Sequence, residues 1–185
     1  VKPNSLIHWR RNKKYSGLNT MVLGIAYESI LRWLGPAQWV RASGKVFKDK
    51  GLDPDTRKVI QIEIPDYLSV QMEMGNGIMG SFLISDIALH GPTPKIEIFG
   101  DQGTLRYLFA IDGELYFSAD PDEDPLPVFI PPESQFNWQV EKEFVKAIRG
   151  KEKIKLTTFE TGVEYMRFTE AVHESLQMLG ERIEL

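Results

Sequence analysis

The chain has 185 residues, of which 42% are hydrophobic and 26% charged, values typical of one soluble globular domain with a sizeable core. The net charge of −4 argues against nucleic acid or an anionic membrane as the main partner. The absence of cysteine excludes thiol catalysis, thiolate metal sites and disulfides, and it fits a reducing cytoplasm.

The first eighteen residues mix Pro, Asn, Lys and Gly, which predicts an irregular entry segment. The chain begins Val1-Lys2-Pro3 without a methionine or an apolar signal region, so we expect its start to be a cut edge. The basic stretch from Arg10 to Lys14 is interpreted as a solvated loop, because Asn12 interrupts it and no basic helix face follows.

A helix is predicted next, capped by Asn19 or Thr20, running to about Leu34 and stopped by Gly35-Pro36. Apolar residues lie on nearly every side of it, a pattern that predicts burial between layers. Glu28 and Arg32 are spaced to pair with each other on its one polar edge.

Alternating hydrophobicity then predicts a series of strands. They cover Ile60 to Ile64, Leu68 to Met74, Ile78 to Leu89, Lys95 to Phe99, Thr104 to Phe109 and Glu114 to Ser118. Tight turns at Gly75-Asn76-Gly77, Gly100 to Gly103 and Asp112-Gly113 connect several of them. A period of two buries one face and leaves the other polar, as in an antiparallel sheet with helices on one side.

We expect two helices to finish the chain. The first has an apolar face made by Phe136, Val140, Phe144, Ala147 and Ile148, and it ends at Gly150. A capping box of Thr157 and Glu160 opens the second, which runs to Gly180, and Ile183 with Leu185 adds an edge strand. The order predicts an α+β, two-layer domain over residues 1–185, with a largely antiparallel β-sheet and helices packed on one face.

Motifs for common chemistry are missing from the sequence. It contains neither the G-x-G-x-x-G of a Rossmann dinucleotide site nor the G-x-x-x-x-G-K-[ST] of a phosphate loop. The acidic loop from Asp120 to Pro127 lacks the spacing of a calcium site, so we expect a surface loop and no metal. His8, His90 and His173 are too far apart for a local metal motif. For His8 and for His90, which precedes Gly91-Pro92, a pocket-facing role and an ordinary structural role both stay open.

Several motifs follow one another in a characteristic order along nearly the whole chain. They are Trp9-Arg10, Ser16-Gly17, GIAYESILRWLG from Gly24 to Gly35, the Gly75 to Gly77 hairpin, IEIFGDQGTL from Ile96 to Leu105, EFVKAIRG from Glu143 to Gly150, and the closing SLQMLG. Together they resemble the C-terminal domain of the Gfo/Idh/MocA family, the glucose–fructose oxidoreductase and inositol dehydrogenase type. The resemblance implies a dihydrodipicolinate reductase-like α+β fold.

The resemblance also implies a function. Family members join an N-terminal Rossmann domain that binds NAD or NADP to a domain like this one, and hydride passes between the nicotinamide and a sugar, polyol or related substrate. The N-terminal Rossmann domain is absent from this chain, so we expect no cofactor and no redox catalysis from the chain by itself. Trp9, Arg10, Asn19 and Tyr27 lie where the family lines its cleft, which makes them candidates for binding substrate. His90 is a further candidate, because it ends a strand just before a loop and loops commonly carry function.

Arg10 could hold a carboxylate or phosphate. Trp9 could stack on a sugar ring, or it could pack in the core. By analogy, the open sheet face makes the contacts of a homodimer or tetramer. The polar side chains assigned to that face suit either a wet interface or solvent; they are Gln61, Glu63, Gln71 and Glu73.

One departure from the family concerns proton transfer. The family helix usually carries an Asp and, one turn later, a His that assists proton transfer, and those positions are Val22 and Ala26 here. The family's further Asp corresponds to Ser29, and its lysine belongs to the absent half. Three alternatives follow: other groups such as Tyr27, Glu28 or Arg10 act instead, the acid–base residues come from the other domain, or the protein is a non-catalytic sugar-sensing or scaffolding homologue.

Overall fold

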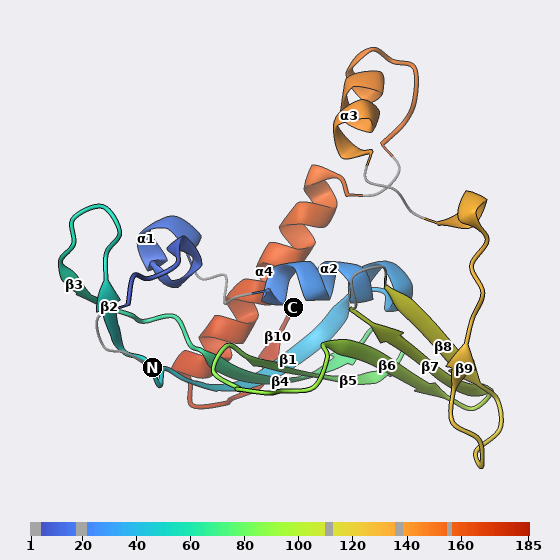
Figure 1. Ribbon diagram of the computed structural model, residues 1–185, viewed down its shortest axis with the longest axis horizontal. Coiled ribbons are helices and arrows are strands. Elements are labelled where there is room, and N and C mark those ends of the chain that lie inside the picture. The colour runs from blue at the N-terminus through green and yellow to red at the C-terminus, as the bar shows by residue number, and fades with distance from the viewer. Residues whose placement is uncertain (1–4, 18–21, 110–112, 136–138, 155–156) are drawn as a thin grey trace. The chain divides into compact units, whose positions relative to one another are not determined.

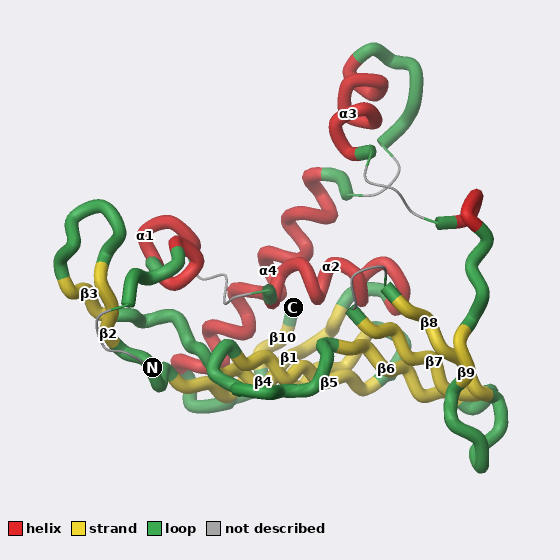
Figure 2. Tube along the Cα trace, viewed as in Figure 1, coloured by secondary structure: helices red, strands yellow, loops and turns green. Residues whose placement is uncertain are grey.

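The computed structural model describes residues 5–17, 22–109, 113–135, 139–154 and 157–185. The chain divides into two compact units (Figures 1 and 2). Unit 1 comprises Val1–Ala88 and Ile154–Leu185, and unit 2 comprises Leu89–Lys153. The sequence suggested one domain over residues 1–185, and that grouping stays a prediction.

Unit 1 is built on an antiparallel sheet with the strand order β10-β1-β4-β5. Its strands are β1 Ala37–Lys45, β4 Tyr67–Met74, β5 Met79–Ser85 and β10 Ile183–Glu184. The alternation predicted for β4, the hairpin into β5 and the C-terminal edge strand are confirmed. Strand β1 escaped prediction because the register shifts between Ala37 and Trp39, which breaks the period of two.

Helices α2 (Leu23–Leu34) and α4 (Phe159–Gln177) cover one face of this sheet (Figure 1). The inward-facing residues Leu68, Val70, Met72 and Met74 of β4 are buried beneath them. Phe168 of α4 stacks on Tyr27 of α2 with ring centroids 3.6 Å apart, and this contact joins the two helices. The predicted α+β class, with helices on one face of an antiparallel sheet, is confirmed.

Helix α2 differs from its prediction in two ways. Val22 is the N-cap and makes no side-chain cap hydrogen bond, while Asn19 and Thr20 lie outside the described residues. The helix is also buried on one side only, because Val22 is 52% exposed, Ile25 67% and Trp33 52%. Within unit 1 the packing against α4 covers one stripe of a helix that is apolar nearly all round. The predicted ion pair between Glu28 and Arg32 is confirmed.

Helix α4 begins one residue later than predicted. Its N-cap is Thr158, whose hydroxyl accepts a hydrogen bond from the Thr161 N–H at 3.2 Å, so the proposed capping box of Thr157 and Glu160 is wrong. Thr157 instead donates its hydroxyl hydrogen to the Glu28 carboxylate. The helix ends at Gln177, before the predicted Gly180.

A smaller part of unit 1 is made of two segments, one before α2 and one between β1 and β4. It consists of η1 Trp9–Arg11, α1 Lys13–Ser16, β2 Lys50–Leu52 and β3 Val59–Gln61, the last two forming an antiparallel pair (Figure 2). The predicted strand from Ile60 to Ile64 is therefore shorter than expected. Gln61 and Glu63 do not lie on the sheet that carries Gln71 and Glu73, which corrects the proposed polar face.

Unit 2 contains an antiparallel meander with the strand order β6-β7-β8-β9. Its elements are β6 Lys95–Gly100, β7 Gly103–Leu108, β8 Glu114–Ser118, β9 Leu126–Pro127, η2 Pro132–Ser134 and α3 Val140–Ile148. The predicted turn before Gly103 is confirmed, and a Cβ at Gly103 would lie 2.3 Å from the Ser118 carbonyl oxygen. Asp112 and Phe136 lie outside the described residues.

The apolar face predicted for α3 is not covered within unit 2. None of the described residues of this helix is buried, and Val140, Phe144, Val145 and Ile148 are all exposed. The sequence pattern shows that a face is apolar, but it cannot show what covers that face. None of the helices in the described ranges has the length and apolarity needed to cross a membrane.

Candidate functional site

The entry segment, residues 5–17, is attached to the edge of β2. The Ile7 N–H donates to the Leu52 carbonyl at 2.9 Å, and the Leu52 N–H donates to the Ser5 carbonyl at 3.1 Å. The Ile7 side chain is buried against Gly51, where a Cβ would lie 2.3 Å from the Ile7 Cγ2 atom. A glycine at position 51 is thus what allows the entry segment to approach the strand so closely.

Two side chains cap the short helical turns of this segment. The Nδ1 atom of His8 accepts a hydrogen bond from the Arg10 N–H at 3.3 Å, and the Oδ1 atom of Asn12 accepts one from the Lys14 N–H at 3.0 Å. These caps define η1 and α1 as successive turns. His8 therefore has a structural role here, one of the two alternatives that its sequence context left open.

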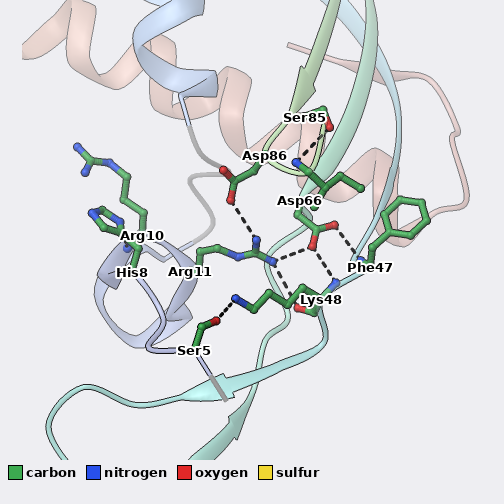
Figure 3. Close-up of polar contacts among 10 residues, drawn as sticks. Ser5, His8, Arg10, Arg11, Phe47, Lys48, Asp66, Ser85 and Asp86 are labelled. Atoms are coloured by element: carbon green, nitrogen blue, oxygen red, sulfur yellow. Dashed lines mark hydrogen bonds and ion pairs between the residues drawn. The ribbon is translucent and has the colours of Figure 1, made fainter. Parts of the chain in front are cut away.

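Arg11 holds the entry segment against the end of the main sheet (Figure 3). Its guanidinium donates to Asp66 Oδ2 at 3.0 Å, to Asp86 Oδ2 at 3.1 Å and to the Lys48 carbonyl at 3.4 Å. The Arg11 side chain is 11% exposed and that of Asp66 is fully buried, so the interpretation of this basic stretch as wholly solvated is wrong at Arg11. Sequence reasoning missed the contact because its partners lie 55 and 75 residues away.

The two carboxylates meet because of the strand register. Asp66 precedes β4 and Asp86 follows β5, and the pairing of Tyr67 with Ser85 places the two aspartates side by side. The Asp86 N–H also donates to the Asp66 carbonyl at 2.9 Å. A single arginine can therefore contact both carboxylates.

The Asp66 carboxylate is well satisfied despite its burial. It accepts hydrogen bonds at 2.8 Å from the Phe47 N–H and at 2.8 Å from the Lys48 N–H, in addition to the one from Arg11. Burial by itself would raise the pKa of Asp66, but these backbone N–H groups and the Arg11 guanidinium outweigh it and hold the pKa below its ordinary value. Asp66 is thus a charged anchor for the entry segment.

A pocket of about 300 Å³ lies between the entry segment and the β2–β3 turn. Its lining residues are Ile7, Trp9, Asn12, Tyr15, Pro54 and Asp55. Asp53 shapes the turn, because its Oδ1 atom accepts from the Thr56 N–H at 2.8 Å, the Thr56 hydroxyl at 3.0 Å and the Asp55 N–H at 3.1 Å. These hydrogen bonds, those from Thr56 foremost, lower the pKa of Asp53.

The predicted substrate-binding residues fall in different places. Trp9 lines the pocket and is 50% exposed, so it does not pack in the core. Arg10 does not line the pocket, and its guanidinium carbon lies 4.2 Å from the centroid of the Trp9 ring. Asn19 lies outside the described residues. His90 belongs to unit 2 and has a positive φ of 58°.

Tyr27 lies in the core of unit 1, with its side chain almost entirely buried. Its hydroxyl oxygen accepts a hydrogen bond from the Ala37 N–H at 2.8 Å, and burial raises the pKa of Tyr27. The structure thus gives Tyr27 a packing role between α2, β1 and α4. It offers no open face to a ligand in this conformation.

Val22 and Ala26 lie one turn apart at the start of α2, and the Ala26 N–H donates to the Val22 carbonyl at 2.9 Å. Val22 is exposed and Ala26 half-buried, so this end of the helix presents hydrocarbon where the family pair was expected. The neighbouring Glu28 carboxylate is held by Arg32 and Thr157. Among the described residues, no group of three or more His, Asp or Glu side chains could hold a metal ion.

Comparison with known proteins gave matches of two kinds. A family model described as the GFO/IDH/MocA C-terminal domain matches residues 2–106. Levoglucosan dehydrogenase, in its apo form, superimposes with a TM-score of 0.80 at 18% identity, covering 100% of this chain and 55% of that one. The same enzyme in complex with NADH and levoglucosan gives a TM-score of 0.79 at 18% identity, covering 100% and 55%.

An NAD binding oxidoreductase from Klebsiella pneumoniae superimposes with a TM-score of 0.74 at 18% identity, covering 99% of this chain and 55% of that one. At such identities the likeness establishes the fold. The chain thus spans about half the length of these solved structures. No curated protein sequence matches it.

Proposed function

The chain belongs to the GFO/IDH/MocA C-terminal domain family, and from this premise we propose that it is the substrate-binding and oligomerisation domain of an NAD(P)-dependent oxidoreductase. The proposed substrate is a sugar, a polyol or a related compound. The family match over residues 2–106 carries the proposal. The fold likeness over the whole chain supports treating its two units as one C-terminal domain.

In this proposal NAD or NADP is held by an N-terminal Rossmann domain, in the part of the relatives that this chain does not match. One similar structure is levoglucosan dehydrogenase in complex with NADH and levoglucosan, and another is an NAD binding oxidoreductase, which supports a nicotinamide cofactor and a carbohydrate-like substrate. The nicotinamide would supply the hydride chemistry. This chain would bind and orient the substrate, with Trp9 as the first residue to test and Arg10 and His90 as further candidates.

The exposed apolar residues of α2 fit an enzyme in which this domain binds substrate and the other domain supplies the acid–base group. Val22 and Ala26 cannot move a proton, and Glu28 is engaged by Arg32 and Thr157. An enzyme built on this chain would therefore draw its acid–base group from the N-terminal domain.

The hydrocarbon side chains of Val22 and Ala26 also favour a second candidate function, a non-catalytic sugar-sensing or scaffolding homologue. One experiment separates the two. The protein extended to include its nucleotide-binding part is mixed with NAD or NADP and a panel of polyols and sugars, and nicotinamide absorbance is followed. Turnover supports the oxidoreductase, whereas failure to bind either nucleotide at millimolar concentration would refute it.

A second test is the double variant Val22→Asp and Ala26→His, which introduces the family's acid–base pair. A scaffold should gain no hydride transfer from these side chains. An oxidoreductase with a weakened site should become faster, because general acid–base catalysis typically contributes about 10²–10⁴-fold.

We further propose that the open face of the main sheet forms a homodimer or tetramer interface, and that the protein is cytoplasmic. Arg41, Gln71 and Ser81 follow one another across this face, next to the exposed Leu83. Leu83→Glu should shift the sedimentation coefficient to that of a monomer. Leu89→Glu should not shift it, because Leu89 is an exposed leucine of unit 2 that lies outside this sheet. A wild-type chain that sediments as a monomer would rule out this interface.

A further inference from the structure

The chain carries two surface segments of opposite charge. The entry segment, residues 5–17, contains four cations and no acid. Residues 120–133, here called the proline-rich segment, contain five acids, five prolines and no cation. The first segment belongs to unit 1 and the second to unit 2. Opposite charges on one chain favour association between copies of that chain.

Aromatic rings with cations on their faces form the edge of the pocket between the entry segment and the β2–β3 turn. Trp9 is 50% exposed and Tyr15 52% exposed, and both line the pocket. The Arg10 guanidinium carbon lies 4.2 Å from the centroid of the Trp9 ring, and the Lys14 ammonium nitrogen lies 5.6 Å from that of the Tyr15 ring. A ligand that reaches these rings therefore meets two cations as well.

The charge at this edge is positive. Two of the four cations of the entry segment, Arg11 and Lys13, have carboxylate partners. The other two, Arg10 and Lys14, lie over aromatic rings, and Lys14 also acts electrostatically on Asp53. The β2–β3 turn contributes two acids and two cations, which are Asp53, Asp55, Arg57 and Lys58. The turn thus adds no net charge, and the pocket edge favours an acidic partner.

The proline-rich segment presents carboxylates next to apolar side chains. Leu126 is 65% exposed and Phe129 83% exposed. Pro131 has φ −58° and ψ 145°, close to the dihedral angles of a polyproline II helix. All five acidic residues of the segment are exposed, namely Asp120, Asp122, Glu123, Asp124 and Glu133.

The pocket and this segment have complementary chemistry. Proline-rich segments dock in grooves lined by aromatic rings, because their backbone is already extended and little conformational entropy is lost on binding. Trp9, Tyr15 and Pro54 supply such a lining here. Carboxylates that flank the docked prolines would lie near the two cations of the pocket edge.

We propose that this pocket binds the proline-rich segment of a second copy of the chain. Leu126 and its flanking prolines would lie against Trp9 and Tyr15, and the run from Asp122 to Asp124 would face Arg10 and Lys14. Two copies can exchange their segments reciprocally, which closes the pair through two equal contacts. The second copy then forms one wall of the pocket in which Trp9 is a candidate for contacting substrate.

The contact is small, and small interfaces are commonly weak and transient. We expect a dissociation constant of about 0.1–1 mM for each contact. At the roughly 10 µM of a sedimentation experiment such a contact is almost unpopulated, so Leu83→Glu should still sediment as a monomer.

The test uses two samples of the 185-residue chain, both carrying Leu83→Glu so that the open sheet face does not contribute. One sample is isotopically labelled and held at about 50 µM, and the other is unlabelled and added up to about 1 mM. The readout is the indole N–H signal of Trp9 in proton–nitrogen NMR spectra, identified by its loss in Trp9→Leu. We expect this signal to shift saturably as the unlabelled chain is added.

Charge reversal in the unlabelled chain tests the electrostatic part of the contact. Asp122→Lys with Asp124→Lys should raise the dissociation constant by about tenfold or more, because two attractions become repulsions. Asp101→Lys with Glu181→Lys is the matched control, since it makes the same charge change at two exposed acids outside the segment. This control should leave the dissociation constant unchanged.

The apolar part is tested with a second pair of variants. Leu126→Ser in the unlabelled chain should weaken binding, whereas Leu179→Ser, at an exposed leucine outside the segment, should not. The spectrum of the main sheet in each variant is first compared with that of the parent chain, to confirm that the fold is kept.

Three outcomes would overturn the proposal. The first is a Trp9 signal that stays unmoved at about 1 mM of unlabelled chain. The second is an equal effect of the charge variant and its control, because association would then follow net charge alone. The third is unchanged binding in Leu126→Ser, which would mean that the segment is attracted to the pocket edge without entering the pocket.

Discussion

Replacing Asp66 by asparagine changes the group on which three donors converge. The carboxylate accepts from Phe47, Lys48 and Arg11, with distances of 2.8, 2.8 and 3.0 Å. An asparagine side chain keeps one acceptor oxygen and turns an NH₂ group toward the remaining donors. The Arg11 guanidinium would also lose the charge that balances it in a site where its side chain is only 11% exposed.

The size of the effect follows from this burial. Removing one partner of a buried ion pair costs about 3–5 kcal/mol, and we expect the lower end because Arg11 keeps Asp86 and the Lys48 carbonyl. With a urea dependence of about 2 kcal/mol per molar, the unfolding midpoint of unit 1 should fall by roughly 1.5 M. The measurement is urea unfolding at pH 7, followed by the loss of the β4 amide signals.

Asp86→Asn is the matched control for this prediction. Asp86 contacts the same guanidinium at 3.1 Å, but its side chain is 54% exposed, and pairs of this kind typically contribute less than about 1 kcal/mol. If Asp66→Asn cost no more than Asp86→Asn, the reasoning from burial would be wrong. The entry segment would then be held by its backbone contacts with β2.

Three further predictions concern the same unit. The first concerns pH. The pKa of folded Asp66 is below its ordinary value of about 3.9, so the stability contributed by its charge is present above that pH and is lost as the pH falls through the folded pKa. The free energies of unfolding of wild type and Asp66→Asn, measured as a function of pH, should therefore converge below about pH 4. Tyr27→Phe keeps the stack on Phe168 but leaves the Ala37 N–H without its acceptor; we expect a loss of about 1–3 kcal/mol, and a loss within experimental error would show that the hydrogen bond contributes nothing. Gly51→Ala places a methyl group 2.3 Å from Ile7 Cγ2 and should lower the free energy of unfolding by about 1–3 kcal/mol. In a chain that also carries Ile7→Ala, the same substitution should cost less. An equal cost with Ile7 and with alanine at position 7 would contradict the steric argument.

Local patterns in the sequence predicted the elements whose conformation depends on near neighbours. The alternation from Leu68 to Met74 identified β4, since a strand with one buried face must repeat every two residues. The Gly75 to Gly77 turn and the Glu28–Arg32 pair were predicted for the same reason, because each involves residues within one turn. The order of such motifs also indicated the family, which the match over residues 2–106 confirms.

The candidate site was only partly predictable. Trp9 was expected near a ligand and does line the pocket, but Tyr15, Pro54 and Asp55 carried no signal. They line the same pocket because the entry segment pairs with β2 through Leu6 and Leu52, a contact that spacing along the chain does not reveal.

Tertiary structure decided the rest through contacts between distant residues. Arg11 resembles its solvated neighbours in sequence, and its burial depends on Asp66 and Asp86, which only the pairing of β4 with β5 brings together. Tyr27 and Ile25 are both apolar positions on one helix, and the packing of α4 buries the first and leaves the second exposed. Sequence by itself determined which faces are apolar, because that depends on periodicity, whereas the folded chain determined which of those faces are covered, because coverage is a long-range property.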